Sequence, residues 1–98
     1  HPAETAFLQG VLRELVGPTN VRTFEPTMSA EDFSFMLEAK AGCYFMIGNG
    51  DGDHRHAGHG LGPCMLHNPS FDFNDALIPI GASAWVRLAQ AWLSHEKM

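Results

Sequence analysis

The sequence predicts an α/β fold with three layers, helix, sheet and helix, in which the sheet is incomplete. Helical patterns alternate with short strand candidates, in the order helix, strand, helix, strand, loop, helix. The second strand candidate, residues 43–47, is apolar without alternation, which is typical of a strand covered on both faces. Two strands are too few for such a sheet, so we expect its other strands to lie upstream of His1.

The first predicted helix covers residues 2–16. Pro2 suits the first helical position. Apolar residues recur on one face at i, i+3, i+4 spacing, namely Leu8, Val11, Leu12, Leu15 and Val16. Gly17 and Pro18 end the helix, and residues 21–24 form the first strand candidate.

A second helix is predicted over residues 29–41. Ser29 can cap its free backbone N–H groups, and Asp32 can reach back in a capping box. This local role explains Ser29 and Asp32 but leaves Glu31 without a stated task. Gly42 is expected to close the helix before the strand of residues 43–47.

Residues 48–62 form a long polar loop in which six of fifteen residues are glycine. Long loops in compact domains are usually functional or mobile. The last helix is predicted from residue 77 or 79 to Ser94. Its polar stripe is narrow, and a helix so apolar packs on more than one neighbour.

Composition excludes several classes of protein. The chain has 98 residues, 45% of them hydrophobic, which indicates a folded domain or part of one. A net charge of −5 argues against a nucleic-acid or anionic-membrane partner. No apolar run approaches the roughly 18 residues of a membrane span. Cys43 and Cys64 both lie in apolar surroundings, so we expect reduced thiols and a cytoplasmic location.

The glycine-rich loop carries histidines at positions 54, 56 and 59, followed by Cys64. These residue types suit zinc, but six glycines give no rigid frame. The loop lacks the Gly and Glu that a calcium loop needs at its sixth and twelfth positions. It does not open into a helix, as a phosphate-binding loop would. We interpret it as a loop at the rim of a cleft, with a metal-binding loop as the alternative.

His67 lies in a stiffer setting, between an apolar run and the Asn68-Pro69 turn. A nearby carboxylate could accept its second ring proton and fix the tautomer that a metal ligand needs. A histidine satisfied by backbone groups is the alternative from the residues alone.

Three segments together resemble a known family: "PTMSAEDFSFML", "YFMIGNG" and "LHNPSFDFNDALIPIGASAWVRLAQAWL". They are similar to the carboxy-terminal end of the metal-dependent amidohydrolases, the hippurate hydrolase, aminoacylase and amino-acid-conjugate hydrolase group of the dinuclear-metal carboxypeptidase-like peptidases. The resemblance implies a phosphorylase/hydrolase-like zinc-peptidase architecture. In it, residues 1–98 are the C-terminal segment of the catalytic domain, without its N-terminal half or the lid domain.

The resemblance also implies roles for individual residues. His67 matches a metal ligand, and the other ligands and the general base are expected upstream, so no catalytic residue is expected within this chain. Supporting positions around the metal ligand are expected at Glu31, Asp32, Asp72, Asn74 and Asp75. Residues of the possible cleft loop are Asn49, His54, His56 and His59. Family members commonly have two acids where this chain has Asn74-Asp75, which leaves open which group orients His67.

The implied reaction is hydrolysis of the amide bond of N-acyl amino acids such as hippurate, with two divalent ions of zinc, manganese, cobalt or nickel per site. The substrate is then a small molecule, and homo-oligomers are expected through the absent lid domain. We expect the 98-residue chain alone to be inactive. Two alternatives stay open: a small non-catalytic α/β interaction module, and a metal-binding protein built on the histidine-rich loop.

Overall fold

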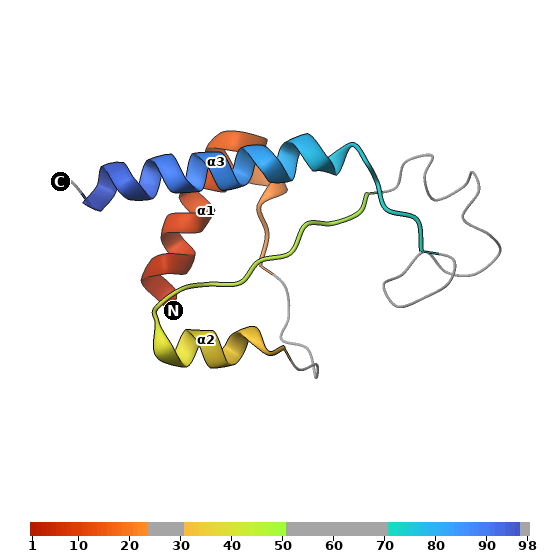
Figure 1. The fold of residues 1–98 in the computed structure, drawn as a ribbon. Coiled ribbons are helices and arrows are strands. Elements are labelled where there is room, and N and C mark those ends of the chain that lie inside the picture. The colour runs from red at the N-terminus through yellow and green to blue at the C-terminus, as the bar shows by residue number, and fades with distance from the viewer. Residues whose placement is uncertain (24–30, 51–70, 97–98) are drawn as a thin grey trace. The chain divides into compact units, whose positions relative to one another are not determined.

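The computed structural model of the chain describes residues 1–23, 31–50 and 71–96. The described elements are α1 (Pro2–Val16), the short 3-10 helix η1 (Pro18–Asn20), α2 (Phe33–Ala39) and α3 (Leu77–Glu96) (Figure 1). The chain divides into two compact units. The first unit contains His1–Met46 and Ser83–Met98, and the second contains Ile47–Ala82.

α1 has the bounds that the sequence predicts. Pro2 stands in the first turn, where its missing N–H group costs no hydrogen bond, and Glu4 lies where the helix dipole favours an acid. The start of α1 is tied to the segment after α2. The backbone N–H of Gly42 donates to Nδ1 of His1 at 3.0 Å, and the backbone nitrogen of His1 donates to the Gly42 carbonyl at 3.0 Å.

α1 ends at a glycine with a backbone conformation that other residues avoid. Gly17 has φ 90° and ψ 149°, and its N–H donates to the Arg13 carbonyl at 2.9 Å. The Asn20 side chain then donates to the Val16 carbonyl at 2.7 Å. These bonds satisfy carbonyls that the end of a helix leaves free. The sequence did not predict η1, which occupies this turn.

α2 is shorter than the predicted helix of residues 29–41. It begins at Phe33, and the side chain of the preceding Asp32 makes no capping hydrogen bond. Ser29, the predicted cap, lies outside the described residues. At the other end Lys40 is already extended, with φ −149° and ψ 138°, so the helix stops before Gly42. Asp32 thus takes the position before the first helical residue, and the capping box with Ser29 stays a prediction.

The predicted α/β class is wrong for the part of the chain that the structure describes, which contains helices and no strand. The strand candidates were residues 21–24, of which 21–23 are described, and residues 43–47. Neither described segment makes a backbone ladder with another described segment. A strand exists only through pairing, so apolar composition alone did not produce one, and no sheet or three-layer arrangement is present among these residues.

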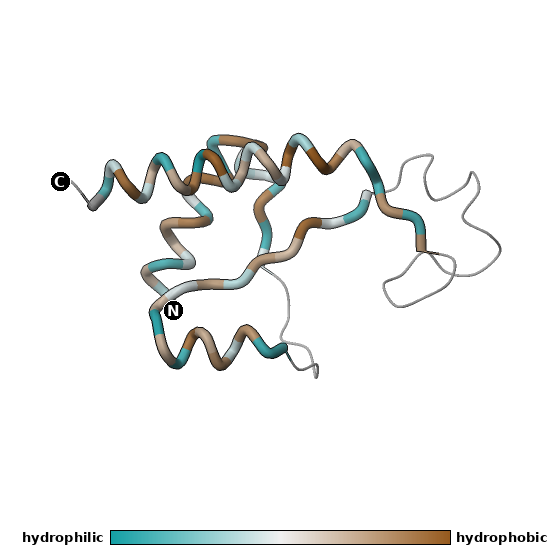
Figure 2. The backbone as a smooth tube through the Cα atoms, viewed as in Figure 1, coloured by the Kyte–Doolittle hydropathy of each residue, from teal (hydrophilic) through white to brown (hydrophobic). Residues whose placement is uncertain are grey.

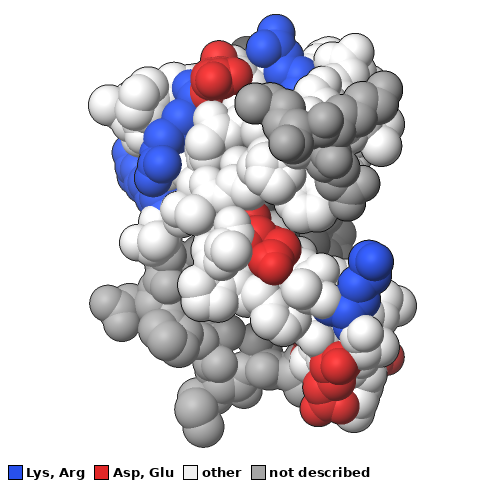
Figure 3. All heavy atoms as spheres, turned by 90° about the vertical axis from the view of Figure 1, so that its left-hand side faces the viewer, with Lys and Arg blue, Asp and Glu red and all other residues white. Residues whose placement is uncertain are grey.

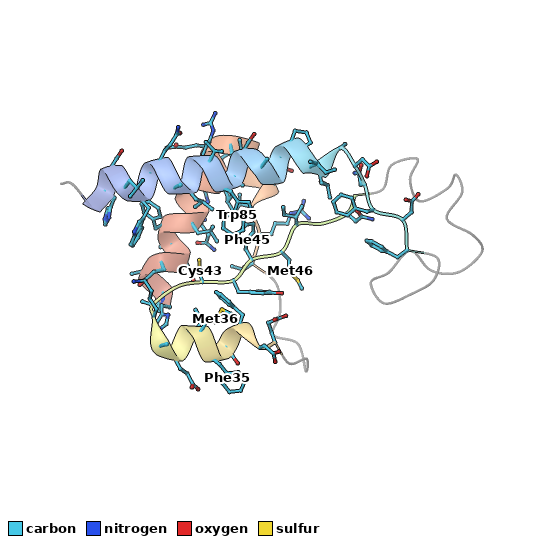
Figure 4. All side chains as sticks on the ribbon, in the orientation of Figure 1. Phe35, Met36, Cys43, Phe45, Met46 and Trp85 are labelled. Carbon is cyan, nitrogen blue, oxygen red and sulfur yellow. The ribbon has the colours of Figure 1, made fainter. Side chains whose placement is uncertain are left out.

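Aromatic contacts join the elements of the first unit. Phe7 of α1 meets Trp92 of α3 edge to face, with ring centroids 5.2 Å apart. Phe45 lies 5.9 Å from Trp85 of α3, measured between centroids (Figure 4). The buried hydrophobic side chains of the described residues are Leu8 and Ala84. The first unit is thus held by a few ring contacts around a small core.

α3 presents two different apolar faces, and Figure 2 shows hydrophobic residues recurring along its length. The better covered face carries mostly small residues, namely Leu77, Gly81, Ala84, Leu88 and Ala91. Larger side chains are exposed, namely Ile78, Trp85, Val86, Trp92 and Leu93. α3 packs on two neighbours, as predicted, because Trp92 meets Phe7 of α1 and Trp85 meets Phe45 of the segment after α2.

Candidate functional site

Two asparagines of the second unit bind each other reciprocally. The side-chain Nδ2 of Asn49 donates to the Asp72 carbonyl at 2.8 Å, and its Oδ1 accepts from the Asn74 N–H at 2.8 Å. In return, Nδ2 of Asn74 donates to the Asn49 carbonyl at 3.2 Å. We call this arrangement of Asn49, Asp72 and Asn74 the amide clasp. It joins residues 47–50 to residues 71–76.

Asn74 also prepares the start of α3. Its Oδ1 accepts from the Ala76 N–H at 3.1 Å, and its carbonyl accepts from the Leu77 N–H at 3.0 Å. This pattern, in which a side chain binds the backbone two residues ahead, stabilises a turn before a helix. One side chain therefore both fixes the helix start and closes the amide clasp.

Gly50 follows Asn49 with φ 75°, a left-handed conformation that favours glycine. A Cβ atom at this position would lie 3.4 Å from Nδ2 of Asn74. Since 3.4 Å is an ordinary van der Waals distance, the left-handed backbone rather than contact with Asn74 favours glycine here.

The structure assigns backbone roles to the two acids of this segment. Asp72 is half-buried and contributes its carbonyl to the amide clasp. Asp75 is exposed, and its carbonyl accepts from the Ile78 N–H at 3.1 Å. Of the predicted site residues, Asn49, Asp72 and Asn74 are thus brought together, and Asp75 is the next residue in the chain.

Glu31 and Asp32 belong to the first unit. The Tyr44 hydroxyl donates to Oε2 of Glu31 at 3.3 Å, and the Tyr44 ring lies 5.7 Å from that of Phe33. Tyr44 thus ties the segment after α2 to the start of that helix. The hydrogen bond gives Glu31 the partner that sequence reasoning did not find, whereas Asp32 caps nothing with its side chain.

The predicted metal ligand His67 lies outside the described residues, as do His54, His56, His59 and Cys64. Within residues 1–23, 31–50 and 71–96, no group of three His, Cys, Asp or Glu side chains could hold a metal ion. The described residues therefore supply no metal site, and we derive no reaction step through one.

Cys43 is a free thiol on the segment after α2. Its Sγ lies 3.8 Å from the Glu4 carbonyl, within hydrogen-bond reach for sulfur. Burial raises the pKa of this thiol above its ordinary value of 9.0; the negative charge of Glu4 adds to the rise and the N-terminal ammonium opposes it. A thiol kept protonated is a poor nucleophile.

The surface charge and the helices of the described residues bear on possible partners. On the face shown in Figure 3, side chains of both signs are interspersed, with uncharged atoms between them. Among the described helices, none combines the length and apolarity needed to cross a membrane. The expectation of no nucleic-acid partner stays a prediction.

Sequence reasoning missed two relationships. The first is the pairing of Asn49 with Asn74. The sequence signals it only in that these two asparagines flank the segment between them. The second is the bond from Tyr44 to Glu31. Both join residues far apart in the chain, so local patterns do not predict them.

Comparisons with known proteins agree with the resemblance seen in the sequence. The profile of peptidase family M20/M25/M40 matches residues 1–91. The chain is 33% identical over 88 residues to a hippurate hydrolase of Campylobacter jejuni, covering 89% of this chain and 20% of that protein. It is 30% identical over 91 residues to the IAA-amino acid hydrolase ILR1-like 4 of Arabidopsis thaliana, covering 93% of this chain and 19% of that protein.

A probable hydrolase of Synechocystis is 36% identical over 75 residues, which cover 76% of this chain and 18% of that protein. The chain therefore spans about a fifth of the length of the curated relatives it matches. No solved structure matches it significantly. The family match over nearly the whole chain confirms the predicted resemblance to the amidohydrolase group. This chain belongs to peptidase family M20/M25/M40.

Proposed function

We propose that the chain is the C-terminal segment of the catalytic domain of an amidohydrolase that cleaves the amide bond of N-acyl amino acids. The observation that carries this proposal is the family match over residues 1–91. The names of two relatives, which specify hippurate and IAA-amino acid as substrates, support the substrate class.

The proposed enzyme depends on two divalent ions, of zinc, manganese, cobalt or nickel, with His67 as one ligand. When bound, such ions lower the pKa of a shared water and so make hydroxide available near neutral pH. The general base and the remaining ligands come from parts of the protein outside this chain. Asp72, Asn74 and Asp75 follow His67 in the sequence, and we propose that they support it.

The hydrogen bonds of the amide clasp are the interactions through which this support would act. Asn74 is held at 2.8 Å and 3.2 Å by Asn49 and at the same time fixes the start of α3. A metal ligand keeps its geometry only when neighbouring groups hold the backbone around it. Asn49 therefore belongs with the supporting residues in this proposal, rather than only with a cleft loop.

Substitution of the proposed ligand tests the function. In the full-length protein, His67→Ala should lower hydrolysis of hippurate by at least about 100-fold and reduce the bound metal measured by elemental analysis. The matched control is Arg87→Gln, at an exposed position of α3 in the first unit. A His67→Ala enzyme with normal metal content and normal hydrolysis would remove His67 from the site.

The expected cellular location and oligomeric state are also part of the proposed function. We propose a cytoplasmic, homo-oligomeric enzyme whose subunits meet through a lid domain outside this chain. The free thiol of Cys43 supports a reducing compartment. Native mass spectrometry of the full-length protein tests the oligomer, and a monomer at micromolar concentration would contradict it.

A small interaction module is a second candidate, because specific exposed side chains favour it. Phe35 and Met36 of α2 are 70% and 62% exposed, and Figure 4 shows them on opposite sides of that helix. Met46 and Trp85 are 60% and 66% exposed. Apolar surface of this kind favours association. Size-exclusion chromatography of the 98-residue chain separates the two candidates, since a clean monomer suits a self-sufficient module.

A further inference from the structure

The dipeptide Asn49-Gly50 is chemically reactive in a way that the proposed function does not use. A backbone N–H that follows an asparagine can attack its side-chain carbonyl carbon, and glycine offers the least hindrance because it has no side chain. The chain has four asparagines. Asn20 precedes the β-branched Val21, and Asn68 precedes a proline, which has no backbone N–H. Asn74 precedes Asp75, which carries a side chain, so Asn49 stands out as the asparagine followed by glycine.

We propose that Asn49 is a site of spontaneous deamidation and that the amide clasp controls its rate. The Gly50 backbone nitrogen forms a bond to Cγ of Asn49, the Cγ–Nδ2 bond breaks, and the proton from Gly50 leaves with the side-chain nitrogen as ammonia. Water then opens the resulting succinimide ring, adding OH to one carbonyl carbon and H to nitrogen. The product at position 49 is aspartate or isoaspartate. One water is consumed, one ammonia is released, and no oxidant is needed.

The amide clasp opposes the first step because it engages both polar atoms of the Asn49 side chain. Nδ2 donates to the Asp72 carbonyl at 2.8 Å, and Oδ1 accepts from the Asn74 N–H at 2.8 Å. The side chain must leave both partners to bring Cγ to the Gly50 nitrogen. Attack then proceeds from a locally opened state, and its rate follows the population of that state. Asn49 is half-buried and Gly50 is exposed, so water reaches the opened segment.

The product does not fit the clasp. An aspartate at position 49 presents an oxygen where Nδ2 stood, opposite the Asp72 carbonyl, and two acceptors cannot share a hydrogen bond. Isoaspartate also adds a backbone atom between Asn49 and Gly50. Deamidation therefore opens the link between residues 47–50 and residues 71–76 irreversibly. This inference concerns described residues alone and does not depend on the proposed hydrolase activity.

The test follows deamidation of the 98-residue chain at mildly alkaline pH by peptide mass mapping. The parent in native buffer should deamidate at Asn49 more slowly than the same chain in denaturant. Asn74→Asp keeps the Oδ1 acceptor for Ala76 and replaces the Nδ2 donor to the Asn49 carbonyl with a carboxylate oxygen, which cannot donate. It should raise the native rate about fivefold, the effect of losing one ordinary hydrogen bond. Asn74→Ala, which removes both side-chain bonds, should raise it at least as much.

Asn20 is the internal control, because its side chain also donates to a backbone carbonyl but in the first unit. Its rate should be the same in parent and Asn74 variants. Circular dichroism checks that helix content is retained. If Asn74→Ala does not fold, the deamidation rate of Asn74→Asp alone tests the proposal. Equal rates at Asn49 in native buffer and denaturant, or an unchanged rate in the folded Asn74→Asp chain, would overturn the proposal.

Discussion

The rings of Phe7 in α1 and Trp92 in α3 meet edge to face, with centroids 5.2 Å apart and planes at 86°. His95 stacks on the same Trp92 at 5.4 Å and also contacts Phe7. These contacts join two helices from opposite ends of the sequence. In a unit with few buried side chains, such a cluster carries a large share of the packing.

A double-mutant cycle should measure this contact. Phe7→Ala should lower the free energy of unfolding by about 1–2 kcal/mol, since the half-buried ring loses part of its apolar burial. The cycle with Trp92→Ala should give a coupling energy of about 0.5–1.5 kcal/mol, the range for edge-to-face pairs. Urea unfolding followed by circular dichroism provides the free energies. The control cycle pairs Phe7→Ala with Trp85→Ala, whose ring contact is with Phe45, and it should show coupling near zero.

Gly10 inside α1 and Gly17 directly after it predict opposite effects of the same substitution. Gly17 has φ 90° and ψ 149°, a region almost closed to other residues, so Gly17→Ala should destabilise the chain by about 1–3 kcal/mol. A Cβ there meets Asn20 only at 3.9 Å, so backbone strain is the cause. Gly10 lies inside the helix with nothing within 4 Å of an added Cβ, and Gly10→Ala should stabilise by about 0.5–1 kcal/mol. Thermal unfolding of both variants checks the signs, and a stabilising Gly17→Ala would refute the strain.

Helix periodicity predicted α1 and α3 well, because both have long apolar stripes and clear end signals. α1 has the predicted bounds, and α3 begins at Leu77, one of the two predicted starts, and ends at Glu96, two residues beyond the predicted end. α2 was overextended, because the capping pattern indicated a start four residues before Phe33. The strand at residues 43–47 was inferred from apolar composition. Apolar composition predicts burial, which this segment does not show, since Tyr44, Met46 and Ile47 are 50%, 60% and 46% exposed. A strand also needs a pairing partner, which local sequence does not specify.

Residues of the candidate site could be predicted only where the family resemblance or the local sequence pattern pointed to them. Asn74 was expected to support His67, and the structure shows the hydrogen bonds through which it holds its segment. The partner Asn49 lies 25 positions earlier, beyond the reach of any helix or turn rule. Glu31 was expected to have a supporting role, and its bond from Tyr44 arises because the segment after α2 returns past the start of that helix. Such pairs depend on tertiary structure.

Cys43 predicts a loss of stability at alkaline pH. Burial raises the pKa of its thiol above 9.0, so the folded chain holds this proton at pH values where the unfolded chain has released it. The stabilisation is fully present below pH 9.0 and is lost as pH rises from there through the raised pKa. Urea unfolding across this window should show a steeper decline for the parent than for Cys43→Ser, whose hydroxyl does not titrate there.

A matched variant separates the causes of that shift. Glu4→Gln removes the negative charge that helps to raise the thiol pKa and keeps the backbone carbonyl 3.8 Å from Sγ. The pKa, followed by thiolate absorbance in a Cys64→Ser background, should fall only part of the way toward 9.0 because burial remains. A pKa of 9.0 or lower in the parent would contradict the burial argument.

The 98-residue chain alone should not hydrolyse hippurate. A catalytic zinc site takes about three protein ligands, and the described residues offer no such group. His67 would be a single ligand, and one imidazole does not hold a two-ion centre. An assay of amine release should therefore give the same rate with and without the purified chain, at any added zinc or manganese. Zinc titration of a His54/His56/His59 triple alanine variant shows whether the loop binds zinc independently. Hydrolysis by the pure chain that a chelator abolishes would mean that these residues contain a complete metal site, and the single-ligand role of His67 would then be wrong.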